Sequence, residues 1–190
     1  RLYLQDEDYR RGLRTLRSAG SHFGTHPDAP KIAEDMSNAF VTLYLKDIAD
    51  SMPPYQAIAL YEEFKELTPA GEQGDVVIQK LADRLAQVDL LDKAARLLMQ
   101  QVDFRLQGEE KARVGARLAT IRLINKQPAM AADAITRSDE TDIPPFLEGQ
   151  RRQLLARAYI DQGFENRALS VLDKDESRYA DLLRAEIYWK

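Results

Sequence analysis

Apolar residues recur along the chain at the spacing of one face of a helix. In the segment 75–106 a first series consists of Val77, Leu81, Leu85 and Val88, and a second of Leu91, Ala94, Ala95, Leu98 and Val102. Steps of three and four residues place side chains on one side of a helix. Only a few residues around Asp89 separate the two series, and short connections join antiparallel neighbours. The pattern therefore predicts a helical hairpin.

The same hairpin pattern returns at a fixed distance along the chain. Steps of 37 residues separate the pairs Leu81-Ala82, Leu118-Ala119 and Leu155-Ala156, and the same step relates Ala94, Ala131 and Ala168, and also Leu98, Ile135 and Leu172. A period of this length is typical of stacked repeat units, because each unit cannot bury its apolar face alone. The sequence therefore predicts an all-α solenoid of antiparallel helical hairpins.

We expect residues 1–190 to form a single repeat array. Its expected parts are a partial unit 1–23, the units 29–69, 72–106, 109–139 and 145–175, and a partial unit 177–190. In the unit 29–69 the first helix is expected over 33–49, and Pro53-Pro54 opens the second. Glycines and prolines in 21–30 predict a loop. The chain starts without methionine and ends inside an apolar helical pattern, so we expect a fragment of a longer protein.

Two single residues mark expected helix ends. Pro128 lies where a second helix should begin, and the first helical position tolerates the missing N–H of proline. Gly163 lies where a first helix should end, at a position that favours positive φ. Both residues place the turn between the two helices of a unit.

Composition narrows the possible functions. Hydrophobic residues make up 44% of the chain, enough for a core between helices, and charged residues make up 31%. The formal net charge of −4 comes from interspersed acids and bases without a basic block, which argues against nucleic-acid binding. No apolar run is long enough to span a bilayer. The absence of cysteine excludes disulfides, thiolate zinc sites and a cysteine nucleophile, but it does not determine the compartment.

Few residues are arranged for chemistry. His22 and His26 are four residues apart, a spacing that could hold a metal on a helix, but Gly24 and Pro27 favour a loop there. The acidic run 6–8 precedes a helix and is expected to cap it. The segment 71–74 lacks the Lys-Ser/Thr of a phosphate-binding loop. We therefore expect no catalytic, cofactor-binding or metal-binding residues.

The last full unit resembles the tetratricopeptide repeat. That family places a leucine and a small residue on helix A, then an aromatic residue, a small residue in the turn and an alanine on helix B, and the matching residues here are Leu155, Ala156, Tyr159, Gly163 and Ala168. The step of 13 residues from the leucine to the alanine is also the family's spacing. Two features depart from the family: its repeat has 34 residues rather than 37, and its early helix-A tryptophan is missing here.

The resemblance implies a right-handed superhelix in which helix-A residues line a concave groove for a peptide or a helix. The groove positions carried over by spacing are Val76, Gln79 and Asp83, then Arg113, Ala116, Thr120 and Ile124, then Gln150, Gln153, Arg157 and Asp161. Of these we select Gln79, Asp83, Arg113, Thr120, Gln153 and Arg157 as the partner-binding residues. Arg113 and Arg157 would anchor a carboxylate, because a guanidinium can bind one bidentately. Alternatively, these are ordinary solvated helix positions.

The expected function is that of a non-enzymatic scaffold for protein–protein interactions, in a protein that general likeness suggests is bacterial. The lysines and asparagine with which some tetratricopeptide domains clamp a C-terminal carboxylate are replaced here, so that type of recognition is not expected. One alternative is a structural spacer that forms homo-oligomers through its ends, where Tyr188 and Trp189 lie. Another is an accessory domain of an enzyme.

Overall fold

The computed structural model describes residues 2–6, 8–46 and 48–189, and the regular structure of these residues consists of helices. This confirms the expected all-α class. The chain forms two compact units, residues 1–88 and 89–190. The division falls between the two helices of the expected unit 72–106, so the two compact units are described separately.

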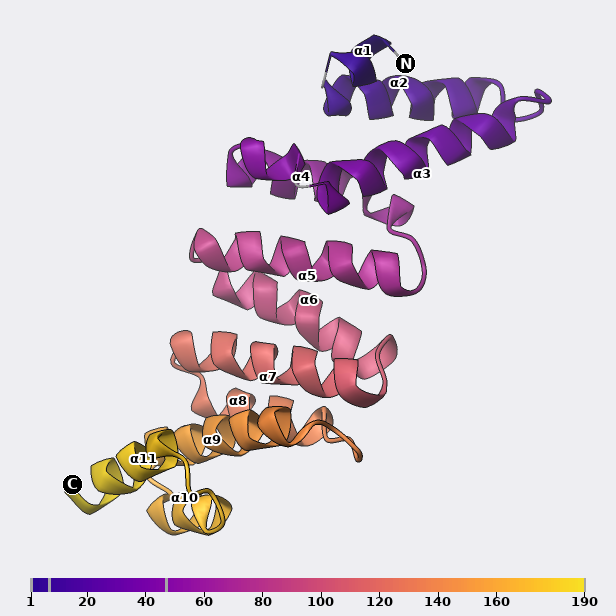
Figure 1. Ribbon diagram of the computed structural model, residues 1–190. Helices are drawn as coiled ribbons and strands as arrows, with labels where there is room; N and C mark the ends of the chain where they lie inside the picture. Colours follow the sequence, from indigo (N-terminus) through magenta and orange to yellow (C-terminus); the bar gives the residue numbers. More distant parts are fainter. Residues whose placement is uncertain (1, 7, 47, 190) are drawn as a thin grey trace. The chain divides into compact units, whose positions relative to one another are not determined.

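The first compact unit contains α1 to α5. Its elements are α1 (Leu2–Gln5), α2 (Tyr9–His22), α3 (Ala29–Leu45), the 3₁₀ turn η1 (Ile48–Ser51), α4 (Pro54–Phe64), the 3₁₀ turn η2 (Lys65–Leu67) and α5 (Glu72–Gln87). Helix α2 packs on α3, and α5 packs on both α3 and α4 (Figure 1). Helix α4 begins at Pro54, as expected, because proline fits the first helical turn.

Two boundaries in this unit differ from expectation. The helix expected over 33–49 runs instead from Ala29 to Leu45, and residues 48–51 form a 3₁₀ turn. The expected loop 21–30 is shorter, because α2 continues beyond Gly20 to His22 and α3 already begins at Ala29-Pro30. Glycine is tolerated inside a helix and proline in its first turn, so neither residue interrupts the helices here.

An aromatic cluster fills the core of the first unit. The ring of Phe40 lies 5.0 Å from that of Tyr44 and 6.1 Å from that of Tyr61, centroid to centroid. Tyr44 is completely buried, and its hydroxyl donates a 2.8 Å hydrogen bond to the carbonyl oxygen of Ala57 on α4. Burial raises the pKa of Tyr44. The hydrogen bond therefore satisfies the one polar atom that this ring takes into the core.

Arginines of α2 reach the end of α4 and the turn η2. Arg10 and Arg14 both bind the carboxylate of Glu63, Arg10 at 3.0 Å, and Arg17 binds Glu66. The guanidinium of Arg17 also lies 4.1 Å from the ring centroid of Phe64. The hydrogen bond from Arg14, reinforced by Arg10, lowers the pKa of Glu63. The ionised form of Glu63 thus stabilises the fold.

Replacement Glu63→Gln is expected to lower the free energy of unfolding at neutral pH. Because the pKa of Glu63 is lower in the folded than in the unfolded state, its contribution is present above the ordinary glutamate pKa of about 4.3 and is lost as the pH falls through the folded value. The free energies of unfolding of the parent and the variant, measured with urea, should therefore become equal in acid. The control is Glu62→Gln, whose partner Lys65 lies 3.6 Å away on the surface. An acid dependence equal to that of the control would contradict this role.

The second compact unit contains α6 to α11. These helices are α6 (Leu91–Phe104), α7 (Gly108–Ile124), α8 (Pro128–Arg137), α9 (Pro145–Asp161), α10 (Glu165–Leu172) and α11 (Arg178–Trp189). Each helix packs on the next one in the chain, and α7 and α11 also pack on α9 (Figure 1). Small residues of α7 permit its contact with α9, where Ala112 and Ala116 are buried against Leu147.

The backbone repeats with the period of the sequence. Helices α4, α6, α8 and α10 begin at Pro54, Leu91, Pro128 and Glu165, each 37 residues after the previous one. Positive φ angles of 61°, 57° and 75° occur at Asp89, Lys126 and Gly163, again at steps of 37. A left-handed residue just after a helix reverses the chain. The structure therefore confirms the turn expected at Gly163 and the helix start expected at Pro128.

Buried hydrogen bonds join three helices of the second unit. The side chain of Arg151 on α9 is 4% exposed and donates hydrogen bonds to the carbonyl oxygens of Ala112 on α7 and Ile135 on α8, at 2.7 and 2.8 Å. It also donates to the hydroxyl of Ser138, at 2.9 Å. Ser138 packs so closely against Gly115 that a Cβ atom there would lie 1.8 Å from its Oγ. We call Gly115, Ser138 and Arg151 the Arg151 cluster.

Candidate protein-interaction surface

One side of α7 and the same side of α9 carry exposed or half-buried residues in a lengthwise stripe. On α7 these residues are Glu109, Arg113, Arg117, Thr120 and Ile124, and on α9 they are Phe146, Gln150, Gln153, Arg157 and Asp161. Most members of the two stripes are paired at a distance of 37 residues, as in Arg113 and Gln150. Steps of three and four residues align each stripe along its helix. We call these ten residues the helix-A face.

On α7 the helix-A face contains an arginine whose charge is already matched. The guanidinium of Arg113 binds Glu109 and lies 3.3 Å from Glu110, both on its own helix, and its side chain is 59% exposed. Thr120 is half-buried, and its hydroxyl donates to the carbonyl oxygen of Ala116 at 3.0 Å. Ala116, one of the positions carried over from the resemblance, is buried.

On α9 two polar residues of the face bind carboxylates of α9, of α11 and of the segment before α11. Arg157 donates hydrogen bonds to Asp161, at 2.6 Å, and to Glu186 of α11, at 2.5 Å. The hydrogen bond with Asp161, together with that from Glu186, raises the pKa of Arg157. The amide of Gln153 donates to Asp175 at 2.9 Å. A partner carboxylate would therefore compete with internal carboxylates for Arg157.

The remaining expected groove residues lie in the first compact unit. Gln79 and Asp83 are half-buried on α5, and each has an interaction partner. The structure thus brings Arg113, Thr120, Gln153 and Arg157 together on neighbouring helices of the second unit. Gln79 and Asp83 lie on α5 of the first compact unit and are not part of this group.

Sequence reasoning missed Phe146, which the structure places in the first turn of α9 with 84% of its surface exposed. The sequence did contain a signal. Phe146 stands where the preceding unit has Glu109, and therefore at a solvent-facing position of the repeat. An aromatic side chain at such a position gives a partner a large apolar contact.

The other expectations concern capping, metals and the chain end. Asp8 caps α2 by accepting a 3.1 Å hydrogen bond from the N–H of Arg11, which confirms its capping role. Glu7 lies outside the described residues.

The two histidines considered as metal ligands do not share a helix. His22 ends α2, and His26 lies in the following turn. Across the described parts of the chain, no group of three or more metal-binding side chains occurs. Trp189 is 92% exposed.

Among the residues that the structure describes, none of the helices combines the length and apolar character needed to cross a membrane.

Comparison of the chain with family models, with curated proteins and with solved structures gives no match. The class of the protein follows from its own fold. It is an all-α protein in which the starts of α4, α6, α8 and α10 recur every 37 residues, as do the turns at Asp89, Lys126 and Gly163.

Proposed function

We propose that this chain is a tetratricopeptide-like solenoid module that binds a segment of a partner protein along the helix-A face. The observation that carries the proposal is the repetition of one solvent-facing stripe on α7 and α9 at the period of the fold. Repeat proteins use such aligned stripes as extended binding surfaces, because equivalent positions of successive units lie side by side. We also propose that the helical hairpins stack into a right-handed superhelix, as the resemblance implies.

The chemistry of the face suits a peptide. Gln150 and Gln153 carry amides, which both donate and accept hydrogen bonds and can therefore meet a peptide backbone. Arg113 is exposed, so a carboxylate of the partner can replace Glu109 or Glu110 at little cost. Phe146 supplies apolar contact area at one end of the stripe. These residues combine an apolar anchor with polar groups that determine orientation.

Peptides selected from a random displayed library on the intact chain should lose affinity when Phe146 is replaced by serine. We expect a Kd about tenfold higher in fluorescence anisotropy, because exposed aromatic side chains are frequent anchors of interfaces. The matched control is Phe104→Ser. Phe104 is equally exposed, at 84%, but lies at the end of α6 outside the helix-A face.

Equal losses in the two variants would remove the helix-A face as the binding site. The self-association alternative rests on α11, where Leu182 and Tyr188 are 66% and 76% exposed beside Trp189. If no peptide is selected and the mass by light scattering grows with concentration, self-association becomes the better account.

A further inference from the structure

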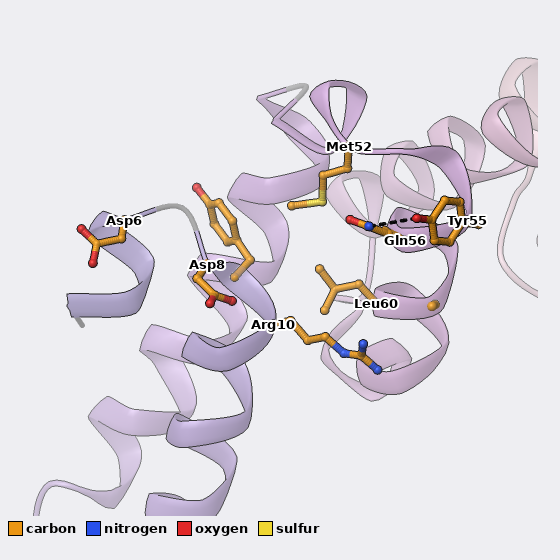
Figure 2. Close-up of a pocket in the computed structure, with 9 residues that line it drawn as sticks. Asp6, Asp8, Arg10, Met52, Tyr55, Gln56 and Leu60 are labelled. Atoms are coloured by element: carbon orange, nitrogen blue, oxygen red, sulfur yellow. Dashed lines mark hydrogen bonds between the residues drawn. The ribbon is translucent and has the colours of Figure 1, made fainter.

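The first compact unit contains a hollow of about 600 Å³ between the N-terminal part of α2 and the helix α4. Its lining residues are Asp6, Asp8, Tyr9, Arg10, Met52, Tyr55, Gln56, Ala59 and Leu60. Figure 2 shows Asp6 and Asp8 on one side, with Met52, Gln56 and Tyr55 across from them. The hollow is therefore bounded by carboxylates on one side and by mostly uncharged groups on the other.

The uncharged part of the hollow is aromatic and aliphatic. Tyr9 and Leu60 are buried at 7% and 3% exposure, and Met52 is half-buried. Tyr55 is 69% exposed, and its hydroxyl accepts a 3.1 Å hydrogen bond from the amide of Gln56. An alkyl chain entering here would exchange water for apolar contacts. A cation above a tyrosine ring would be attracted by the negative face of the ring.

The charges of the lining favour a positive occupant. Arg10, the cation in the lining, binds Glu63 at 3.0 Å, and Glu63 is not a lining residue. Glu63 also binds Arg14, so it offsets only part of the charge of Arg10. Asp8 lies 3.4 Å from Arg11, but the Arg11 side chain is 74% exposed, and such surface pairs are weak. Asp8 also accepts the capping hydrogen bond from the N–H of Arg11. With two carboxylates and one guanidinium, the lining nevertheless keeps a net negative charge, on the side of Asp6 and Asp8.

We propose that this hollow receives a lysine or arginine side chain of a partner protein. The aliphatic stem would lie against Met52 and Leu60, and the charged end would approach Asp6 and Asp8. Long basic side chains combine an apolar stem with a charged tip, which matches the two halves of the lining. An acidic side chain would meet like charge, and an aliphatic one would leave the carboxylates without a counter-ion. The site lies in a different compact unit from the helix-A face.

The methyl group of Met52 offers a direct reporter. The chain has four methionines, so methyl-labelled methionine gives a simple NMR spectrum of the intact protein. Titration with the blocked tripeptides Gly-Arg-Gly and Gly-Lys-Gly should shift the Met52 signal saturably, and added salt should weaken binding. The signal of Met130, which is 53% exposed on α8, should stay unchanged and serves as the internal control.

The charged residues are tested by Asp6→Asn/Asp8→Asn. Asparagine keeps the cap of α2 while removing the charge, so the fold is retained. We expect a Kd about fivefold higher than in the parent. The control is Asp28→Asn, an exposed carboxylate next to α3 that does not line the hollow.

Three outcomes would overturn the proposal. These are no shift of Met52, equal shifts with Gly-Leu-Gly, and an unchanged Kd in the double variant. Because this test does not involve α7 or α9, its failure leaves the peptide-binding proposal standing, and the converse also holds.

Discussion

Replacement Gly115→Ala is expected to lower the free energy of unfolding by about 3 kcal/mol, because α7 and the end of α8 are in direct contact at this glycine. An added Cβ would lie 1.8 Å from Oγ and 2.2 Å from Cβ of Ser138, which is completely buried. Helix propensity alone predicts the opposite sign, since alanine is favoured over glycine by about 1 kcal/mol. We expect the clash with Ser138 to outweigh the gain in helix propensity. Urea unfolding followed by circular dichroism measures the net change in the free energy of unfolding.

Gly149→Ala on α9 is the matched control for this substitution. A Cβ atom at Gly149 meets nothing within 4 Å, so only helix propensity acts and a gain of up to about 1 kcal/mol is expected. Removing the opposing side chain in Gly115→Ala/Ser138→Gly should recover part of the loss, because the next atom, the carbonyl oxygen of Ala134, lies at 3.4 Å. Equal effects of the two alanine substitutions would contradict the close contact.

Replacement Arg151→Ala is expected to destabilise the second compact unit by about 3 kcal/mol. The change removes the hydrogen bonds to Ala112, Ile135 and Ser138 and leaves a cavity where three helices meet. Burial lowers the pKa of Arg151, which means that the folded site disfavours the bare charge. The hydrogen bonds and the packing of the side chain must therefore offset its desolvation.

Two variants separate these contributions. Arg152→Ala changes the neighbouring arginine, which is 38% exposed and bound to Glu148 on its own helix, and should cost no more than about 0.5 kcal/mol. Arg151→Met keeps most of the side-chain volume but not the donors, and its unfolding free energy should lie between those of Arg151→Ala and the parent. Hydrogen exchange of α7 to α9 would place the loss in this unit. Similar losses at Arg151 and Arg152 would refute a special role for the buried arginine.

The sequence predicted those features that depend on neighbouring residues or on the repeat. Apolar residues at steps of three and four located the helices, and Pro54, Pro128 and Gly163 marked helix ends correctly. Asp89 and Lys126 adopt the same left-handed conformation as Gly163, although aspartate and lysine, unlike glycine, do not by themselves predict a positive φ. Only the 37-residue period relates these turns. Between α2 and α3 the sequence suggested too long a loop, because α2 continues to His22 and Pro30 lies in the first turn of α3.

The candidate binding residues show the limit of such reasoning. Spacing placed Gln153 and Arg157 on one side of α9, and the structure agrees. It could not reveal that Gln153 binds Asp175 or that Arg157 binds Glu186, since these partners lie 22 and 29 residues away along the chain. Whether an arginine is available to a partner depends on which carboxylates fold against it. The same holds for the hollow beside α4, whose lining comes from residues 6 and 8–10 and from the segment 52–60.

By itself the sequence determined the all-α class, the helix-forming segments and the period, because helix periodicity and turn preferences act over a few residues. The tertiary structure decided which charges are matched, where Phe146 and the hollow are open to a partner, and why Gly115 must be small. Those properties depend on contacts between residues far apart in the chain. Arg151 illustrates the difference. Its sequence neighbours indicate an ordinary polar helix residue, and only the packing of α7, α8 and α9 buries its side chain where it donates hydrogen bonds to α7 and α8.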